Sequence, residues 1–151
     1  MTAEDSARIE QLVARTGVFN AEEVQIARSL AEQALIGGPE AGYEFLFADG
    51  VQSIEAYTCF GPIPDTDRRY ELYWIAVDSQ AQRRGLARAL PAATEKATAS
   101  RGAMRFFAET SGLPSYAPAH ALYERSGCRL YATNSDCHAE GDSLLVFGKA
   151  L

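Results

Sequence analysis

The sequence predicts a mixed α/β (α+β) fold, in which one central mixed sheet carries helices on both of its faces. Three features of the 151 residues lead to this prediction. Helical spacing of apolar residues fills about the first quarter of the chain, an alternating pattern follows, and helical and alternating segments then take turns. This order is neither that of a Rossmann fold nor that of a barrel.

Two helices are expected first. One runs from about Asp5 to Ala14 and ends near Gly17. The second follows Asn20, which can cap it while Glu23, three residues later, completes a capping box. The pair Gly37-Gly38 should end it.

Three strands should come next. Tyr43–Ala48 and Val51–Phe60 flank Asp49-Gly50, a two-residue turn signal that predicts an antiparallel hairpin. The segment Arg69–Val77 is the strongest strand signal because it is aromatic and β-branched, with Glu71 as its polar interruption. We expect it in the centre of the sheet.

The rest of the chain is predicted to form two helices, Gly85–Ser100 and Ser115–Ser126, with a strand between them at Met104–Thr110. Two further strands should follow, at Cys128–Thr133 and Ser143–Lys149. The strand at Met104 should return parallel to the central strand through a right-handed crossover. The apolar face of the longer helix is predicted to consist of Leu86, Ala89, Leu90, Ala93 and Ala97.

Composition narrows the functional classes. With 47% hydrophobic and 23% charged residues, we expect one globular domain over residues 1–151. Twenty acidic and 14 basic residues give a formal net charge of −6, and the basic residues are scattered, so nucleic acid is not an expected ligand.

No apolar run approaches the roughly 20 residues that span a bilayer, and the start is polar, which predicts a cytoplasmic protein rather than a membrane or secreted one. Cys59, Cys128 and Cys137 show no CxxC spacing, so neither a disulfide framework nor a metal site is expected.

An anion site is predicted between the central strand and the helix after it. Backbone N–H groups from about Gln82 to Ala87 should point out of the helix start, and Gly85 allows a phosphate to approach the backbone. Arg83, Arg84 and Arg88 add positive charge. Because the loop has neither GxxxxGK[ST] nor GxGxxG, the pyrophosphate of another kind of cofactor fits best.

Gln82-Arg83-Arg84-Gly85-Leu86-Ala87 follows the pattern [Q/R]xxGx[G/A]. In this context the chain resembles the GCN5-related N-acetyltransferase (GNAT) family, a likeness that covers about Tyr43 to Leu151 and includes Ala121–Gly127. The resemblance implies a sheet whose fourth and fifth strands splay apart to bind acetyl-CoA. The family's first edge strand has no clear counterpart before the first predicted helix.

The resemblance also implies residue roles. The central strand should contact the pantetheine arm through its backbone, and the loop and helix start should hold the phosphates. The implied cofactor-binding residues are Ile75, Ala76, Val77, Gln82, Arg83, Arg84, Gly85, Leu86, Ala87 and Arg88.

Two catalytic residues are implied. Glu71 aligns with the general-base glutamate of the family's histone-acetylating members, although it could instead pair with Arg69 or Arg105. Tyr123 matches the tyrosine that protonates the departing sulfur in many members; the alternative is ordinary packing on a helix face.

Other polar residues are weaker candidates. His120 and His138 are single histidines, and Cys137 lies beside His138 only in sequence, which does not make a catalytic dyad. Six carboxylates border the expected acceptor pocket or are simply solvated. They are Asp65, Asp67, Glu109, Asp136, Glu140 and Asp142.

The predicted function is therefore acetyl-CoA-dependent N-acetyl transfer to the primary amine of a small molecule, by direct attack in a ternary complex. Cationic amines should be preferred because the chain is acidic. The alternatives are a GNAT module that binds acyl-CoA without turnover and an acetyltransferase of protein N-termini or lysines. The sequence leaves open whether the protein is a monomer or a homodimer.

Overall fold

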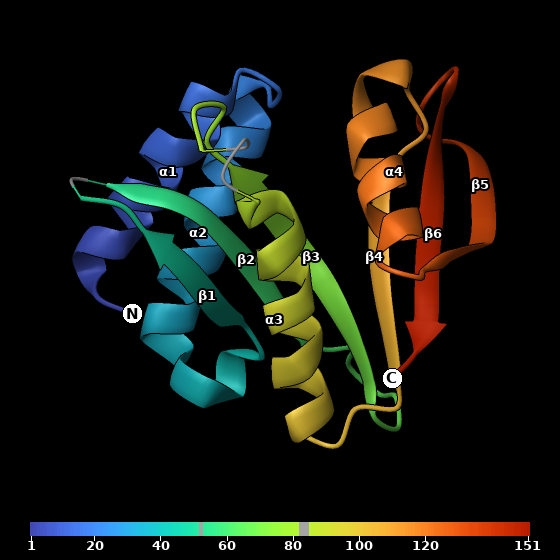
Figure 1. Ribbon diagram of the computed structural model, residues 1–151, viewed down its shortest axis with the longest axis horizontal. Coiled ribbons are helices and arrows are strands. Elements are labelled where there is room, and N and C mark those ends of the chain that lie inside the picture. The colour runs from blue at the N-terminus through green and yellow to red at the C-terminus, as the bar shows by residue number, and fades with distance from the viewer. Residues whose placement is uncertain (52, 82–84) are drawn as a thin grey trace.

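The structure is a computed structural model that describes residues 1–51, 53–81 and 85–151 (Figure 1). The helices are α1 (Ala3–Thr16), α2 (Ala21–Gly37), α3 (Leu86–Ser100) and α4 (Ala117–Arg125), with short 3₁₀ turns η1 (Gly38–Ala41) and η3 (Pro114–Tyr116). The strands are β1 (Glu44–Asp49), β2 (Ile54–Pro62), β3 (Arg69–Val77), β4 (Arg105–Ser111), β5 (Arg129–Ala139) and β6 (Asp142–Ala150). They form one mixed sheet in the order β1-β2-β3-β4-β6-β5, in which β3 is central and parallel to β4, as predicted.

Helices cover both faces of the sheet, which confirms the predicted fold class. In Figure 1, α3 and α4 lie in front of the sheet and α1 and α2 behind it. The core behind the sheet consists of Ile9, Leu12, Val13, Val24, Ala27, Ala31, Ile54, Tyr57, Cys59 and Ala76. The core in front consists of Phe60, Leu72, Phe106, Ala108, Tyr123, Cys128 and Phe147. Within residues 1–51, α1 comes before the first strand.

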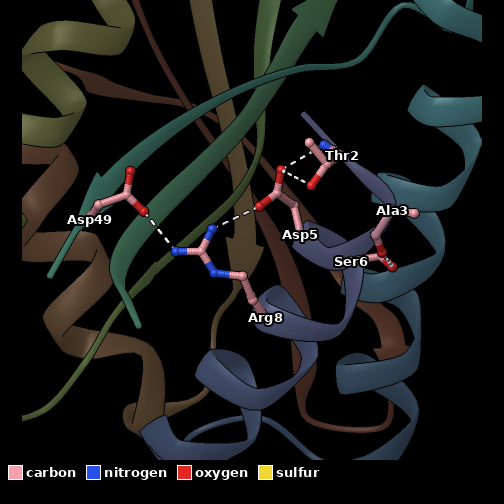
Figure 2. Close-up of polar contacts among 6 residues, drawn as sticks. All are labelled: Thr2, Ala3, Asp5, Ser6, Arg8 and Asp49. Atoms are coloured by element: carbon pink, nitrogen blue, oxygen red, sulfur yellow. Dashed lines mark hydrogen bonds and ion pairs between the residues drawn. The ribbon is translucent and has the colours of Figure 1, made fainter. Parts of the chain in front are cut away.

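Capping boxes begin both amino-terminal helices. The predicted one is confirmed: the Glu23 N–H donates to Asn20 Oδ1 (2.9 Å), and the Asn20 N–H donates to Glu23 Oε2 (2.8 Å). A second box, not predicted, joins Thr2 and Asp5 at the start of α1. Figure 2 shows that Arg8 bridges this Asp5 to Asp49 at the end of β1, with both N···O distances at 2.8 Å. The start of α1 is thereby fastened to the first hairpin.

The first hairpin is antiparallel as predicted, but its two-residue turn is wrong. Asp49 still belongs to β1 and pairs with Ile54 after a bulge at Ala48/Asp49, so the connection is longer. It is closed by a hydrogen bond from the Gly50 N–H to the Ser53 carbonyl (2.8 Å).

The predicted apolar face of α3 is partly wrong. Ala89 and Ala93 are exposed, whereas Thr94 and Thr98 are completely buried. Burial of these two hydroxyls is possible because each donates to a carbonyl one turn back, and Thr94 Oγ1 also lies 2.8 Å from Thr58 Oγ1 of β2.

The last hairpin is longer than predicted. Residues expected to form a loop continue β5 to Ala139, which pairs with Asp142. Every residue of β5 is exposed, so no alternation of apolar and polar residues marks it in the sequence. The turn is stabilised by Gly141, at φ +82°, whose N–H donates to Asp136 Oδ1 (2.7 Å).

Candidate functional site

The centre of the sheet opens between its two parallel strands. Residues Arg69–Leu72 of β3 pair with Arg105–Ala108 of β4, and the pairing stops there. The rest of β3, to Val77, pairs only with β2 among the described residues. Figure 1 shows β3 and β4 diverging upward from this point. In the family's strand order, which counts an edge strand before the first helix, β3 and β4 correspond to the splayed fourth and fifth strands that the resemblance implies.

A β-bulge lies where the splay begins. Leu72 pairs with Phe60 and Trp74 pairs with Cys59, so Tyr73 is an extra residue on β3. A bulge bends its strand and increases the local twist, which turns the later half of β3 away from β4.

The free edge of β3 carries three of the predicted cofactor residues. Ile75, Ala76 and Val77 pair with β2 on one side and with no described strand on the other. Backbone N–H and C=O groups along the open side therefore remain available to a ligand.

A groove of about 390 Å³ lies between α3 and α4, the two helices in front of the sheet in Figure 1. It contains predicted cofactor residues Ala87 and Arg88, together with a second cation from α4. The lining residues are Ala87, Arg88, Ala92, Glu95, Leu122, Arg125 and Ser126. Small apolar side chains and two arginines, beside one carboxylate, give the groove a chemistry that can hold an anionic ligand with an apolar arm.

The start of α3 suits an anion. Gly85 caps the helix at φ +78°, a left-handed conformation that favours glycine, and no side chain caps the first turn. First-turn N–H groups, including that of Leu86, are thus directed toward a ligand at the helix end. The predictions for Gln82, Arg83 and Arg84 lie outside the described residues.

Glu71 lies at the edge of the splay on the α1/α2 face. Its neighbours Tyr70 and Leu72 pack on the opposite face, so the alternation of the strand directs Glu71 away from α3 and α4. Glu71 is paired in register with Phe107, and Glu109 follows two residues later on the same face of β4. Burial, and secondarily the charge of Glu109, raises the pKa of Glu71 to about 7.

The alternative of an ion pair for Glu71 finds no support. Arg69 donates to the Asp67 carbonyl (2.6 Å), and Arg105 donates to the Tyr131 hydroxyl (2.6 Å). Within the described residues Glu71 has no ion-pair partner. A carboxyl with a pKa near neutrality and no cation to hold its charge is suited to accept a proton.

Tyr123 lies on the other face at the same level. It is 7% exposed and belongs to the cluster that contains Leu72 and Ala108, the last parallel pair before the splay. Its ring lies 5.5 Å from that of Phe147, and burial raises the pKa of its phenol. The two predicted catalytic residues therefore approach the splay from opposite faces of the sheet.

The six acidic candidates lie in three parts of the fold: the β2–β3 connection, the last hairpin, which includes Asp142 at the start of β6, and β4. Asp65 and Asp67 lie in the β2–β3 connection, next to the paired start of β3 and β4 and away from the open end of the splay. Asp136 and Glu140 belong to the last hairpin. Glu109 is exposed although β4 is an interior strand, so the α1/α2 face of β4 is open to solvent.

The remaining candidates stay weak. His120 contacts the Ser111 carbonyl through Nε2 (2.8 Å) and lies near Phe147 (ring centroids 5.8 Å apart), which is a structural role. His138 and Cys137 are exposed on β5. Sequence reasoning missed Glu23 and Tyr116, which meet across 93 residues at the open end, because no local pattern signals such a contact.

Comparison with known proteins identifies this arrangement. The acetyltransferase (GNAT) family model matches residues 9–128. The chain belongs to the GNAT family. A crystal structure of a protein assigned to the GNAT acetyltransferases of Desulfovibrio desulfuricans is 36% identical, with a TM-score of 0.95 over 99% of this chain and 94% of that one.

More distant GNAT structures share the fold. The ribosomal-protein-S18-alanine N-acetyltransferase from Escherichia coli is 20% identical (TM-score 0.77; 99% and 90% coverage). An aminoglycoside 6'-N-acetyltransferase complexed with coenzyme A is 13% identical (TM-score 0.71; 99% and 92% coverage). No curated protein matches the sequence. In the described part of this GNAT chain, no helix is long and apolar enough to cross a membrane, and no His, Cys, Asp and Glu cluster could hold a metal.

Proposed function

We propose that this GNAT protein transfers an acetyl group from acetyl-CoA to the primary amine of a small molecule, by direct attack within a ternary complex. The observation that carries the proposal is the splay between β3 and β4, with a groove of about 390 Å³ between α3 and α4 and the exposed carboxylate of Glu109 on the other face. When bound, acetyl-CoA supplies an acetyl group activated as a thioester.

The chain's own residues would perform three tasks. Arg88, Arg125 and the start of α3 would bind the phosphates, and free N–H groups of β3 would stabilise negative charge on the reacting carbonyl oxygen. Glu71 would take a proton from the acceptor, directly or through a water molecule. Its raised pKa narrows the gap to an alkylamine near 10.4 from about 6 pH units to about 3.

Tyr123 would provide the opposite proton transfer. Burial keeps its phenol protonated, so that it can donate to a departing thiolate on the α3/α4 face. A proton acceptor behind the sheet and a donor in front of it match the two sides on which an amine attacks and a thiol leaves.

The acceptor is proposed to be cationic. Three carboxylates gather behind the splay and at its open end, namely Glu71, Glu109 and Glu23. Their field would attract polyamine-like or amino-sugar amines and disfavour acidic amino acids.

The proposal is tested by following thiol release with acetyl-CoA and a panel of amines, alongside calorimetric binding of acetyl-CoA. Acceptor-dependent release that is greatest for cationic amines, with kcat/KM falling as salt rises, is expected. Tight binding without release for any amine would instead indicate a non-catalytic acyl-CoA module. Release only with peptides would indicate a protein acetyltransferase.

A further inference from the structure

A single hydrogen bond joins the two halves of the molecule at the open end of the splay. The Tyr116 hydroxyl, in η3, donates to Glu23 Oε1, in the first turn of α2, at 2.8 Å. Both side chains are partly buried. We call this contact the Tyr116–Glu23 bridge.

The bridge crosses from one side of the splay to the other. Phe19, just before α2, lies 5.1 Å from Trp74 between ring centroids, so the start of α2 covers the part of β3 beyond the bulge. Tyr116 follows the end of β4 by five residues, on the other arm of the splay. β3, the start of α2, the bridge and β4 are therefore joined by a continuous series of contacts on the α1/α2 side of the splay.

Both partners are held in place. The second oxygen of Glu23 accepts from the Asn20 N–H in the capping box, which fixes the carboxylate. Burial, with the charges of Glu23 and Asp142, raises the pKa of Tyr116 to about 12, so its hydroxyl remains a donor at neutral pH. A charge-assisted bond between fixed partners is stronger than an ordinary surface contact.

We propose that the Tyr116–Glu23 bridge is a size filter, which admits small amines to the α1/α2 side of the splay and excludes amines within a polypeptide chain, such as a lysine side chain. This inference rests on the proposed acetyl transfer and concerns its acceptor. A small amine needs room at one end only. A lysine within a peptide has polypeptide chain on both sides of it. Its backbone would lie across the open end of the splay and would have to displace the bridge.

The filter is tested with two conjugates that need no turnover. In both, coenzyme A sulfur is joined through an acetyl linker to an amine: a small diamine in one, and the ε-amine of a central lysine in a heptapeptide in the other. Affinities are measured by calorimetry for the wild-type protein and for Tyr116→Phe, which keeps the ring but removes the donor.

The wild-type protein should bind the small conjugate at least about tenfold more tightly. Tyr116→Phe should bind the peptide conjugate about tenfold more tightly than the wild-type protein does, because a charge-assisted hydrogen bond no longer has to be broken. Its affinity for the small conjugate should change by less than about twofold. Glu23→Gln preserves the capping box, since glutamine also serves at that position, and should give a smaller change in the same direction. Tyr131→Phe is the matched control, because its hydroxyl meets Arg105 at the closed end.

Equal wild-type affinity for the two conjugates, or an unchanged ratio in Tyr116→Phe, would overturn the filter. If the small conjugate binds but no amine causes thiol release, the proposed acetyl transfer is wrong. The filter is then still tested by the ratio of the affinities for the two conjugates. If neither conjugate binds, the cofactor site and the filter both fail.

Discussion

Glu71 and Glu109 offer the sharpest test of the proposed chemistry. The pKa of Glu71 rises from 4.5 to about 7, with burial as the larger cause and Glu109 as the smaller one. Of this rise of about 2.5 pH units, less than half therefore belongs to Glu109. Glu109→Gln removes the like charge and should lower the pKa of Glu71, by the smaller part of that rise.

The assay is the pH dependence of kcat/KM, which reports groups of the free enzyme. A base must be deprotonated to act, so wild-type activity should rise as pH increases through about 7. In Glu109→Gln this acidic limb should move to lower pH, and in Glu71→Gln it should disappear with a large loss of rate.

Glu124→Gln, an exposed carboxylate on α4, is the control and should leave the limb in place. An acidic limb that stays at the same pH in Glu109→Gln, or moves upward, would refute the electrostatic coupling. A limb that survives in Glu71→Gln would remove Glu71 from the mechanism.

Three further substitutions test other parts of the site. Tyr123→Phe should lower kcat by roughly 10- to 100-fold with little change in acetyl-CoA affinity by calorimetry; an unchanged kcat would exclude its role as proton donor. Gly85→Val should weaken acetyl-CoA binding at least about tenfold, because φ +78° is strained for valine and its side chain lies beside the anion site; unchanged affinity in a folded variant would contradict that site. Gly148→Ala should destabilise the protein by roughly 1 to 3 kcal/mol in denaturant unfolding, because its Cβ would lie 2.6 Å from Phe107 Cδ1; wild-type stability would show that the ring can move freely.

Local sequence signals predicted the elements that local chemistry determines. The capping box of Asn20 and Glu23 gave the start of α2, and aromatic and β-branched residues gave β3 with its observed bounds. The splay came from the family resemblance. Its position follows from the bulge at Tyr73, which depends on the pairing with β2.

What the sequence could not predict depends on distant partners. Thr94 is polar by composition and becomes a core residue only because Thr58 of β2 meets it. The tail of β5 has no apolar face to mark it as a strand. In the sequence Glu109 is not distinguished from the other acidic residues, and only the register of β4 with β3 places it diagonally from Glu71.

The opposite placement of Glu71 and Tyr123 has a kinetic consequence for the proposed reaction. In this proposal the sheet separates the two reactants: the donor would enter from the side of α3 and α4, where the groove lies, and the acceptor from the side of α1 and α2. Neither reactant blocks the path of the other, so either one can bind first and both can be bound at the same time. Initial rates measured against both substrates should therefore give intersecting double-reciprocal lines, and the acceptor should not compete with acetyl-CoA for the free protein.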